Sequence, residues 1–263
     1  MPTVRSSDGT TIAYDRTGAG PAIIFVAGAL SVRANAAALA TLLAPRLTVF
    51  AYDRRGRGDS GDTPPYAVAR EVDDLAALIA VAGGSAFVYG HSSGAVLALE
   101  AAARGLAITR LTLYEPPFIV DHSRPLPPPD FPAQIDQLLA AGRRGDALER
   151  FMVEAVQVPA EMVAQMRRGP DWPRLEAVAP TLAYDMAITA NTQNGDPSVL
   201  RRWAALTTPT LVLDGGASPD WARTSVKLLA ETMPNAQHRT LGGQTHGADP
   251  KVLAPVLLEF FAG

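Results

Sequence analysis

Ser92 is the central residue of the segment Gly-His-Ser-Ser-Gly at positions 90–94. An apolar run precedes this segment and an alanine-rich run follows it, so the pattern predicts a strand, a sharp turn and a helix. A serine on such a turn projects its hydroxyl away from the sheet, and the flanking glycines leave room for neighbouring backbone. The segment therefore predicts a nucleophilic serine. The alternative is a glycine-rich connecting loop without chemistry.

A serine hydroxyl is a poor nucleophile at neutral pH and needs a positioned base, for which histidine is well suited. His246 is the candidate, because it lies in a glycine-rich loop, residues 242–247, that can bring the ring over the edge of a sheet. The other histidines are weaker candidates. His91 lies within the serine turn and is expected to pack beside it, His238 lies in a predicted strand, and His122 is either exposed or lines a pocket.

The elements that must position these residues alternate between strand and helix. An early hairpin is predicted for residues 3–6 and 10–16. Buried strands are then predicted at 21–27, 47–52, 85–89, 108–114, 210–213 and 237–241, and helices at 31–43 (with Ser31 as N-cap), 67–81, 95–104, 221–233 and 250–261. This alternation predicts an α/β fold with a mostly parallel, doubly wound sheet, whose site lies at the carboxyl ends of the strands.

The pattern changes between residues 118 and 205. Prolines at the start give way to short helical runs at 135–141, 147–156, 161–168, 182–189 and 199–205, with no buried strand among them. We expect a core of residues 1–117 and 206–263, and a helical cap of residues 118–205 that shields the site. The alternative is helical packing remote from the site. Six apolar residues of this segment either line a substrate pocket or form the core of the cap: Phe131, Phe151, Trp172, Tyr184, Met186 and Trp203.

The composition narrows the choice of ligand. The 263 residues carry a formal net charge of -3 and no lysine or arginine block, which argues against nucleic acid or an anionic membrane as a partner. The chain has no cysteine, no dinucleotide-binding fingerprint and no histidine and carboxylate spacing typical of a metal site, so no cofactor is implied. We expect a cytoplasmic protein acting on a small apolar or neutral molecule; its oligomeric state stays open.

Taken together, the chain resembles the α/β-hydrolases that carry a helical cap. The resemblance rests on the turn around Ser92, the Gly28-Ala29 turn after an early strand, the loop Asp-Arg-Arg-Gly-Arg-Gly-Asp-Ser at 53–60, and a histidine before the last helix. It implies a triad in the chain order serine, acid, histidine, and an oxyanion hole formed by the backbone amides of Ala29 and Ser93. It also implies that the loop arginines fold back onto local acids.

This sequence departs from many relatives in one position of the oxyanion turn. They carry a histidine before the glycine, whereas this chain has Ala27. The backbone donors do not depend on that side chain, but what orders the turn is left open.

Three residues compete for the role of the acid. Most relatives place it after the strand predicted at 210–213, where this chain offers Asp214 and Asp220; some place it after the preceding strand, where Glu115 stands. A buried carboxylate at a strand end is costly unless it is paired, and orienting a histidine would supply the partner, which favours Glu115. Without such a role, Glu115 would anchor the cap and Asp220 would be a helix N-cap.

These residues predict a serine hydrolase that cleaves an ester, lactone or related activated carbonyl through an acyl-enzyme. Ser92 argues against the epoxide hydrolase and dehalogenase branches of the fold, which resemble it but use aspartate at that position. Two alternatives stay open: a carbon–carbon bond hydrolase or lyase using the same residues, and a ligand-binding or receptor protein with a vestigial triad.

Overall fold

The computed structural model describes residues 1–262 and contains one eight-stranded sheet with the strand order β1-β2-β4-β3-β5-β6-β7-β8. β1 and β2 form an antiparallel hairpin, β2 pairs antiparallel with β4, and the remaining neighbours are parallel. The α/β fold predicted from the alternating pattern is therefore confirmed. The strands are Thr3–Arg5 (β1), Thr11–Thr17 (β2), Ala22–Val26 (β3), Thr48–Tyr52 (β4), Ala86–His91 (β5), Ile108–Tyr114 (β6), Thr210–Gly215 (β7) and Ala236–Leu241 (β8).

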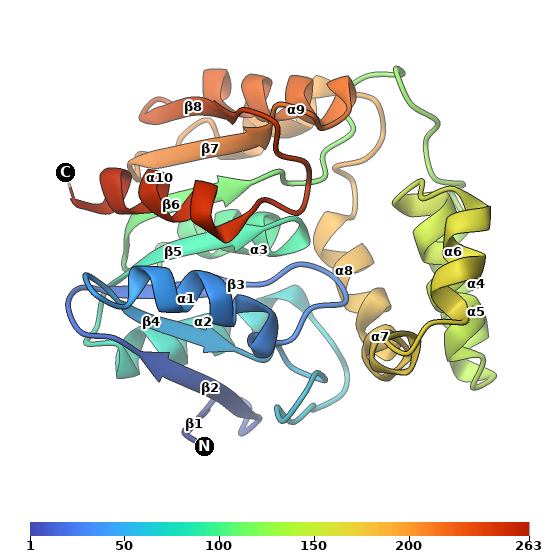
Figure 1. Cartoon of the computed structure of the whole chain (residues 1–263), viewed down its shortest axis with the longest axis horizontal. Helices are drawn as coiled ribbons and strands as arrows, with labels where there is room; N and C mark the ends of the chain where they lie inside the picture. The colour runs from blue at the N-terminus through green and yellow to red at the C-terminus, as the bar shows by residue number, and fades with distance from the viewer. Residues whose placement is uncertain (263) are drawn as a thin grey trace.

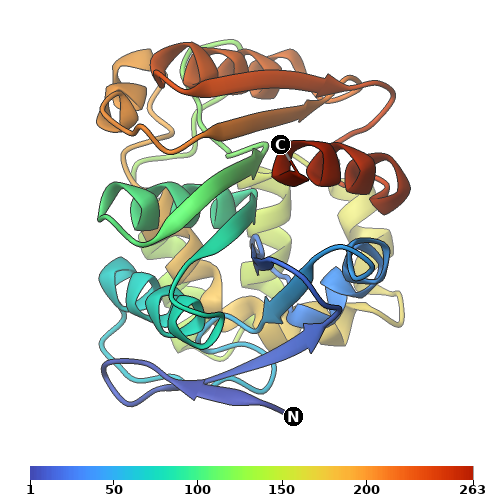
Figure 2. The same cartoon turned by 90° about the vertical axis from the view of Figure 1, so that its left-hand side faces the viewer.

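Helices cover both faces of this sheet (Figures 1 and 2). On one face, α1 (Ala37–Leu43) and α10 (Pro250–Ala262) pack on alternate strand residues such as Ile23 and Val49. On the other, α2 (Val68–Val81), α3 (Ser93–Ala103) and α9 (Asp220–Thr232) pack on the intervening residues, such as Ile24 and Phe50. Because the central strands are buried on both faces, they read as continuous apolar runs in the sequence.

Residues between β6 and β7 form a group of helices beyond the carboxyl ends of the strands, at the right of Figure 1. They are α4 (Phe131–Ala140), α5 (Arg144–Arg150), a π-helical turn (Phe151–Ala155), α6 (Ala160–Arg167), α7 (Trp172–Val178), a 3₁₀ helix (Ala179–Thr181) and α8 (Leu182–Thr189). A second 3₁₀ helix (Pro197–Trp203) packs beside α9 on the sheet instead. This segment has an apolar cluster of its own, built around Ile135, Leu148 and Trp172. α8 joins the two parts, since Leu182 belongs to that cluster and Ile188 to the core under the sheet.

One local prediction was wrong, and one helix was not predicted. Ser31 does not cap a helix: a short 3₁₀ helix, Arg33–Ala36, comes before α1, and the Ser31 hydroxyl donates to the carbonyl of Ala29 instead. The sequence pattern also did not predict α7, a helix of seven residues. A proline occupies its second position, where a helix tolerates proline but where the residue also suggests a loop.

Candidate active site

Ser92 lies between β5 and α3 in the sharp turn that the sequence pattern predicts, with φ of 56°. Its amide donates to the carbonyl of Tyr114 at 2.9 Å, which ties the turn to the neighbouring strand β6. A Cβ atom on Gly94 would lie 2.2 Å from the carbonyl oxygen of Val26, and one on Gly28 would lie 2.8 Å from the Ser92 Cβ. The glycines are therefore required because the β3 turn and the serine turn press directly on each other.

Strained backbone gathers at this end of the sheet. Of the five non-glycine residues with positive φ in residues 1–262, three follow β3, β5 and β6 directly or closely: Leu30, Ser92 and Glu115. A positive φ is unfavourable for residues with a Cβ and persists only where surrounding contacts impose it. Two of these three residues, Ser92 and Glu115, are ones that the sequence singled out for chemistry.

The structure brings Glu115 and His246 together from positions 131 residues apart. The Glu115 Oε2 atom lies 2.7 Å from His246 Nδ1, and Oε1 accepts a hydrogen bond of 2.8 Å from the Gly215 amide. Burial of Glu115, which is 2% exposed, raises its pKa, but these hydrogen bonds outweigh burial and hold the pKa below its usual value. An ionised carboxylate can only accept, so Nδ1 carries the proton and Nε2 presents its lone pair.

The loop that carries His246 is held by two side chains from the strand ends. Tyr114 Oη donates to the carbonyl of Thr245 at 2.5 Å, and His91 Nε2 donates to the carbonyl of His246 at 2.8 Å. The two imidazole rings lie 4.7 Å apart. The His246 side chain is 49% exposed, and within residues 1–262 it makes no hydrogen bond to the Ser92 hydroxyl. Bonds of this kind are often long before substrate binds and shorten in the reacting complex.

His91 gives the stability a pH dependence. Burial, followed by the nearby His246, lowers the pKa of His91 from 6.5 to about 4. Between these pH values the unfolded chain binds a proton at His91 that the folded chain does not, so the free energy of unfolding falls as the pH falls from 6.5 to 4, by at most about 3 kcal/mol. Glutamine keeps a hydrogen-bond donor but does not titrate. We therefore expect the free energy of unfolding of His91→Gln, measured in urea at pH 7, 5.5 and 4, to fall less with decreasing pH than that of the native protein. His122→Gln, which replaces an exposed histidine, is the control. An equal dependence of the free energy of unfolding on pH in all three proteins would contradict the expectation.

The amides of Ala29 and Ser93 lie on the two turns that press on each other. Among residues 1–262, neither amide donates a hydrogen bond to another protein group. For Ser93 this follows from its place as the first residue of α3, since the first amides of a helix have no partner within it. Two unpaired donors beside a strained serine are the arrangement that an oxyanion requires.

The other candidate acids lie elsewhere. The buried carboxylate of Asp214 accepts from His238 Nε2 at 3.1 Å. Asp220 begins α9 with a side chain that is 94% exposed and 3.7 Å from Arg223. The structure therefore places neither beside His246. Of the remaining histidines, His238 belongs to β8 and His122 is an exposed residue packed on Gly195.

The three arginines after β4 are buried and paired with acids. Arg54 makes a bidentate pair with Glu71, and Arg55 makes one with Asp74, all at 2.7–2.8 Å. The acids in both pairs lie on α2, as expected from the folded-back loop. Arg57 instead binds Asp185 of α8 at 2.6 Å, a partner 128 residues away that sequence spacing does not reveal.

The large apolar side chains of the inserted segment belong mainly to its interior. Phe131 and Trp172 are buried in its apolar cluster, with Phe151 and Met186 packed against it. Trp203 packs on Phe118 in the core under the sheet. Tyr184 stacks on Tyr66 at 3.9 Å between ring centres. Of the two interpretations of these residues, core packing describes most of them.

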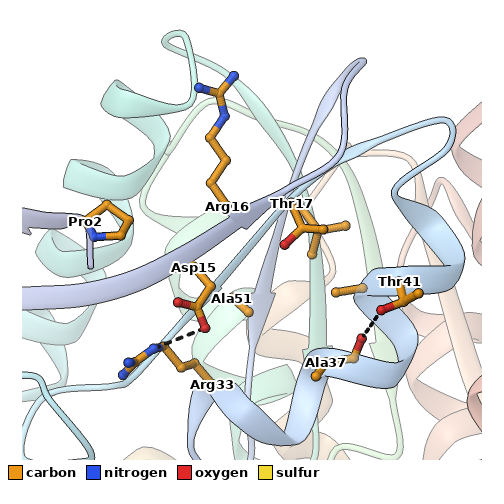
Figure 3. A pocket seen from close by; sticks show the side chains of 10 residues that line it. Pro2, Asp15, Arg16, Thr17, Arg33, Ala37, Thr41 and Ala51 are labelled. Carbon is orange, nitrogen blue, oxygen red and sulfur yellow. Dashed lines mark hydrogen bonds and ion pairs between the residues drawn. The ribbon is translucent and has the colours of Figure 1, made fainter.

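A hollow of about 400 Å³ lies away from these residues, between β2, α1 and β4 (Figure 3). Its wall includes the ion pair of Arg33 with Asp15 at 3.2 Å, and none of Ser92, Glu115 and His246 lines it. Within the described chain, residues 1–262, no cluster of three or more histidine, aspartate or glutamate side chains has the geometry to hold a metal ion. No helix in that range is long and apolar enough to cross a membrane.

The sheet order, the serine turn after β5 and the histidine loop before α10 define the α/β-hydrolase class of proteins. A model of the alpha/beta hydrolase family matches residues 23–255, and the chain belongs to this family.

Solved structures resemble the whole chain. The crystal structure of an alpha/beta hydrolase from Sphaerobacter thermophilus is 58% identical, with a TM-score of 0.93 over 99% of this chain and 100% of that one. The esterase RhEst1 from Rhodococcus is 22% identical, with a TM-score of 0.69 over 100% and 98% of the two chains. An N-formylmaleamic acid deformylase from Pseudomonas putida is also 22% identical, with a TM-score of 0.66 over 97% and 98%. At such low identity the last two share the fold alone.

Proposed function

We propose that this protein is a serine hydrolase that cleaves a carboxylic ester, lactone or related activated carbonyl through an acyl-enzyme. Ser92 is the nucleophile, His246 the general base and acid, Glu115 the acid that orients His246, and the amides of Ala29 and Ser93 form the oxyanion hole. The observation that carries the proposal is the 2.7 Å contact between the buried Glu115 carboxylate and His246 Nδ1, on a sheet edge shared with the strained Ser92. An ionised carboxylate at this buried position is costly unless it is paired, and orienting and stabilising a base supplies the partner.

Acylation follows from this geometry. The Ser92 Oγ atom attacks the carbonyl carbon as its proton passes to His246 Nε2, and the carbonyl π electrons move onto the oxygen. The amides of Ala29 and Ser93 stabilise the resulting oxyanion. The tetrahedral intermediate collapses, the bond to the alcohol breaks, and His246 returns the proton to the leaving oxygen. Glu115 stays ionised throughout and stabilises the imidazolium.

Deacylation repeats these steps with water as the nucleophile. His246 takes a proton from water, whose oxygen attacks the acyl carbon, and the proton is then delivered to Ser92 Oγ as the acid leaves. We propose that residues 118–205, most of which stand beyond the carboxyl ends of the strands, limit the access of bulk water and shape the acyl pocket.

The test combines pre-steady-state kinetics with covalent labelling. We expect p-nitrophenyl acetate to release a stoichiometric burst of p-nitrophenolate before the steady state, because the acyl-enzyme accumulates. A fluorophosphonate should modify the folded protein once, and mass spectrometry of peptides should place the label on Ser92. Heat-denatured protein is the control and should not react.

The outcomes separate the alternatives. Turnover without a burst but with a label on Ser92 also supports the proposal, since acylation is then the slow step. Absence of both turnover and label would overturn it in favour of a binding protein. A label on another serine would overturn the assignment of Ser92.

A further inference from the structure

Asp185 lies on α8, in the segment inserted between β6 and β7, yet its carboxylate reaches the serine turn. It is 2% exposed, and its Oδ1 atom accepts a hydrogen bond of 2.7 Å from the Ser93 hydroxyl. The same Oδ1 atom accepts from Arg54 at 2.7 Å, and Oδ2 accepts from Arg57 at 2.6 Å. Ser93 supplies one of the two amides of the candidate oxyanion hole, so Asp185 contacts the residue that carries a donor.

The two arginines hold the turn that carries the other donor. Arg57 Nη1 donates to the carbonyl of Gly28 at 2.6 Å, and also to that of Ser31 at 3.3 Å. Arg54 Nη1 donates to the carbonyl of Ala27 at 3.3 Å. These carbonyls flank Ala29, so both sides of the oxyanion hole are bound to a single buried cluster. Leu30 reinforces the link, because it packs against the apolar cluster of the inserted segment.

The charges of this cluster balance. Glu71 takes the remaining donors of Arg54 in a bidentate pair, so two guanidinium groups face two carboxylates, all 1–2% exposed. Burial raises the pKa of Asp185, but Arg57 and Arg54 lower it more, and the net pKa is below its usual value. A buried ionic cluster of this kind is rigid because any displaced member loses its compensation in a medium of low dielectric.

We propose that Asp185 is a positioning residue that, through Ser93 and the two arginines, fixes the oxyanion-hole amides of Ser93 and Ala29. The proposal rests on the proposed function. It accounts for a turn that is ordered although Ala27 occupies the position where many relatives carry histidine. It also means that the inserted segment contributes a side chain to the organisation of the catalytic turn, so the oxyanion hole is complete only when α8 is docked.

A positioning role has a kinetic signature that a structural role lacks. Misplaced donors weaken binding of the tetrahedral transition state but not of the planar ester, so kcat should fall while KM stays nearly constant. Complete loss of one oxyanion donor costs roughly 10²–10³-fold in kcat, so a displaced donor should cost about 10–100-fold.

The experiment compares Ser93→Ala, Asp185→Asn and Ser225→Ala with the native protein. Ser93→Ala removes only the hydroxyl group that donates a hydrogen bond to Asp185, and it keeps the backbone amide. Ser225→Ala is the matched control, because Ser225 is a fully buried helical serine on α9 whose hydroxyl donates to the Ala222 carbonyl. The measurements are kcat and KM for p-nitrophenyl acetate, the inhibition constant of a trifluoromethyl ketone that forms a tetrahedral adduct with an active serine, and the melting temperature.

We expect Ser93→Ala and Asp185→Asn to lower kcat about 10–100-fold, with KM within about twofold. The inhibition constant should rise in proportion to the loss of kcat/KM, and Ser225→Ala should match the native protein. Asp185→Asn adds a net positive charge near the oxyanion, so a variant as fast as the native protein or faster would show that charge and not position matters, and would overturn the proposal. If Asp185→Asn does not fold, Ser93→Ala decides alone.

Two further results would also overturn it: a higher KM at unchanged kcat in Ser93→Ala, or an equal loss of kcat in Ser225→Ala. Failure of the proposed function is distinguishable from these results, because it would already be evident in the native protein as absence of both turnover and Ser92 labelling.

Discussion

Ser92→Ala is expected to reduce kcat for ester hydrolysis by about 10⁶-fold, the loss typical of removing the nucleophile from a serine, histidine and acid triad. The alanine methyl group cannot form the acyl-enzyme, and the remaining groups can only assist direct attack by water. The residual rate should still exceed that of the uncatalysed reaction by about 10³–10⁴-fold, because the oxyanion donors are left in place.

The measurement is single-turnover and steady-state hydrolysis of p-nitrophenyl acetate at protein concentrations high enough to detect the residual rate. Ser225→Ala controls for the loss of a buried hydroxyl, and the melting temperature of Ser92→Ala should not fall, since the substitution removes no contact except that of the hydroxyl itself. Retention of turnover within about tenfold of the native rate would contradict nucleophilic catalysis by Ser92. It would favour a mechanism in which His246 activates water or substrate directly.

Much of the fold could be predicted because local patterns and tertiary structure agree. The strand Ile108–Tyr114 and the helix Leu182–Thr189 have the predicted bounds. The continuous apolar runs indicated strands buried on both faces, and their alternation with helices indicated a parallel sheet covered by helices on both sides. The turn around Ser92 was predictable for the same reason. Its glycines indicate that two backbone segments lie close together, as they must in any fold that contains this turn.

The sequence favoured Glu115 as the acid but left Asp214 and Asp220 open, because all three carboxylates stand at or beyond the ends of two neighbouring strands. Only the register and the strained backbone decide which one faces the loop of His246. Positive φ at Glu115 turns its side chain toward that loop, whereas Asp214 faces His238 on the neighbouring strand β8. Neither direction is encoded in local composition.

The cluster around Asp185 was hidden for a different reason. Its members come from the loop after β4 and from α2, α3 and α8, and Asp185 is the one charged residue of a short, mostly apolar helix. The one available signal was the count of arginines in the loop 53–60: three buried cations need nearby carboxylates, and α2 supplies two. The third arginine also needs an acid, but the loop itself contains Asp53 and Asp59, so the sequence does not show that its partner is Asp185.

Glu115→Gln is expected to lower kcat by about 10⁴-fold while the fold is retained. The substituted side chain would present an amide donor to His246 Nδ1, and the ring would respond by carrying its proton on Nε2, where it cannot accept the proton of Ser92. An amide also fails to stabilise the imidazolium that forms during acylation. Both effects act on acylation and on deacylation, since His246 is the base in each step, so kcat should fall while KM changes little, and the rate of the burst should fall along with kcat.

Asp220→Asn and Asp214→Asn are the matched controls, since each neutralises another carboxylate near the ends of the same strands. The Asp220 side chain is exposed and turned toward Arg223, so its loss should leave kcat within about threefold. Asp214→Asn removes the negative charge that faces His238 and should affect stability more than turnover. Reversed severities, with Asp220→Asn inactive and Glu115→Gln active, would transfer the role of the acid to Asp220. They would also require the His246 loop to turn away from the contact with Glu115, because one imidazole Nδ1 atom can be oriented by only one carboxylate at a time.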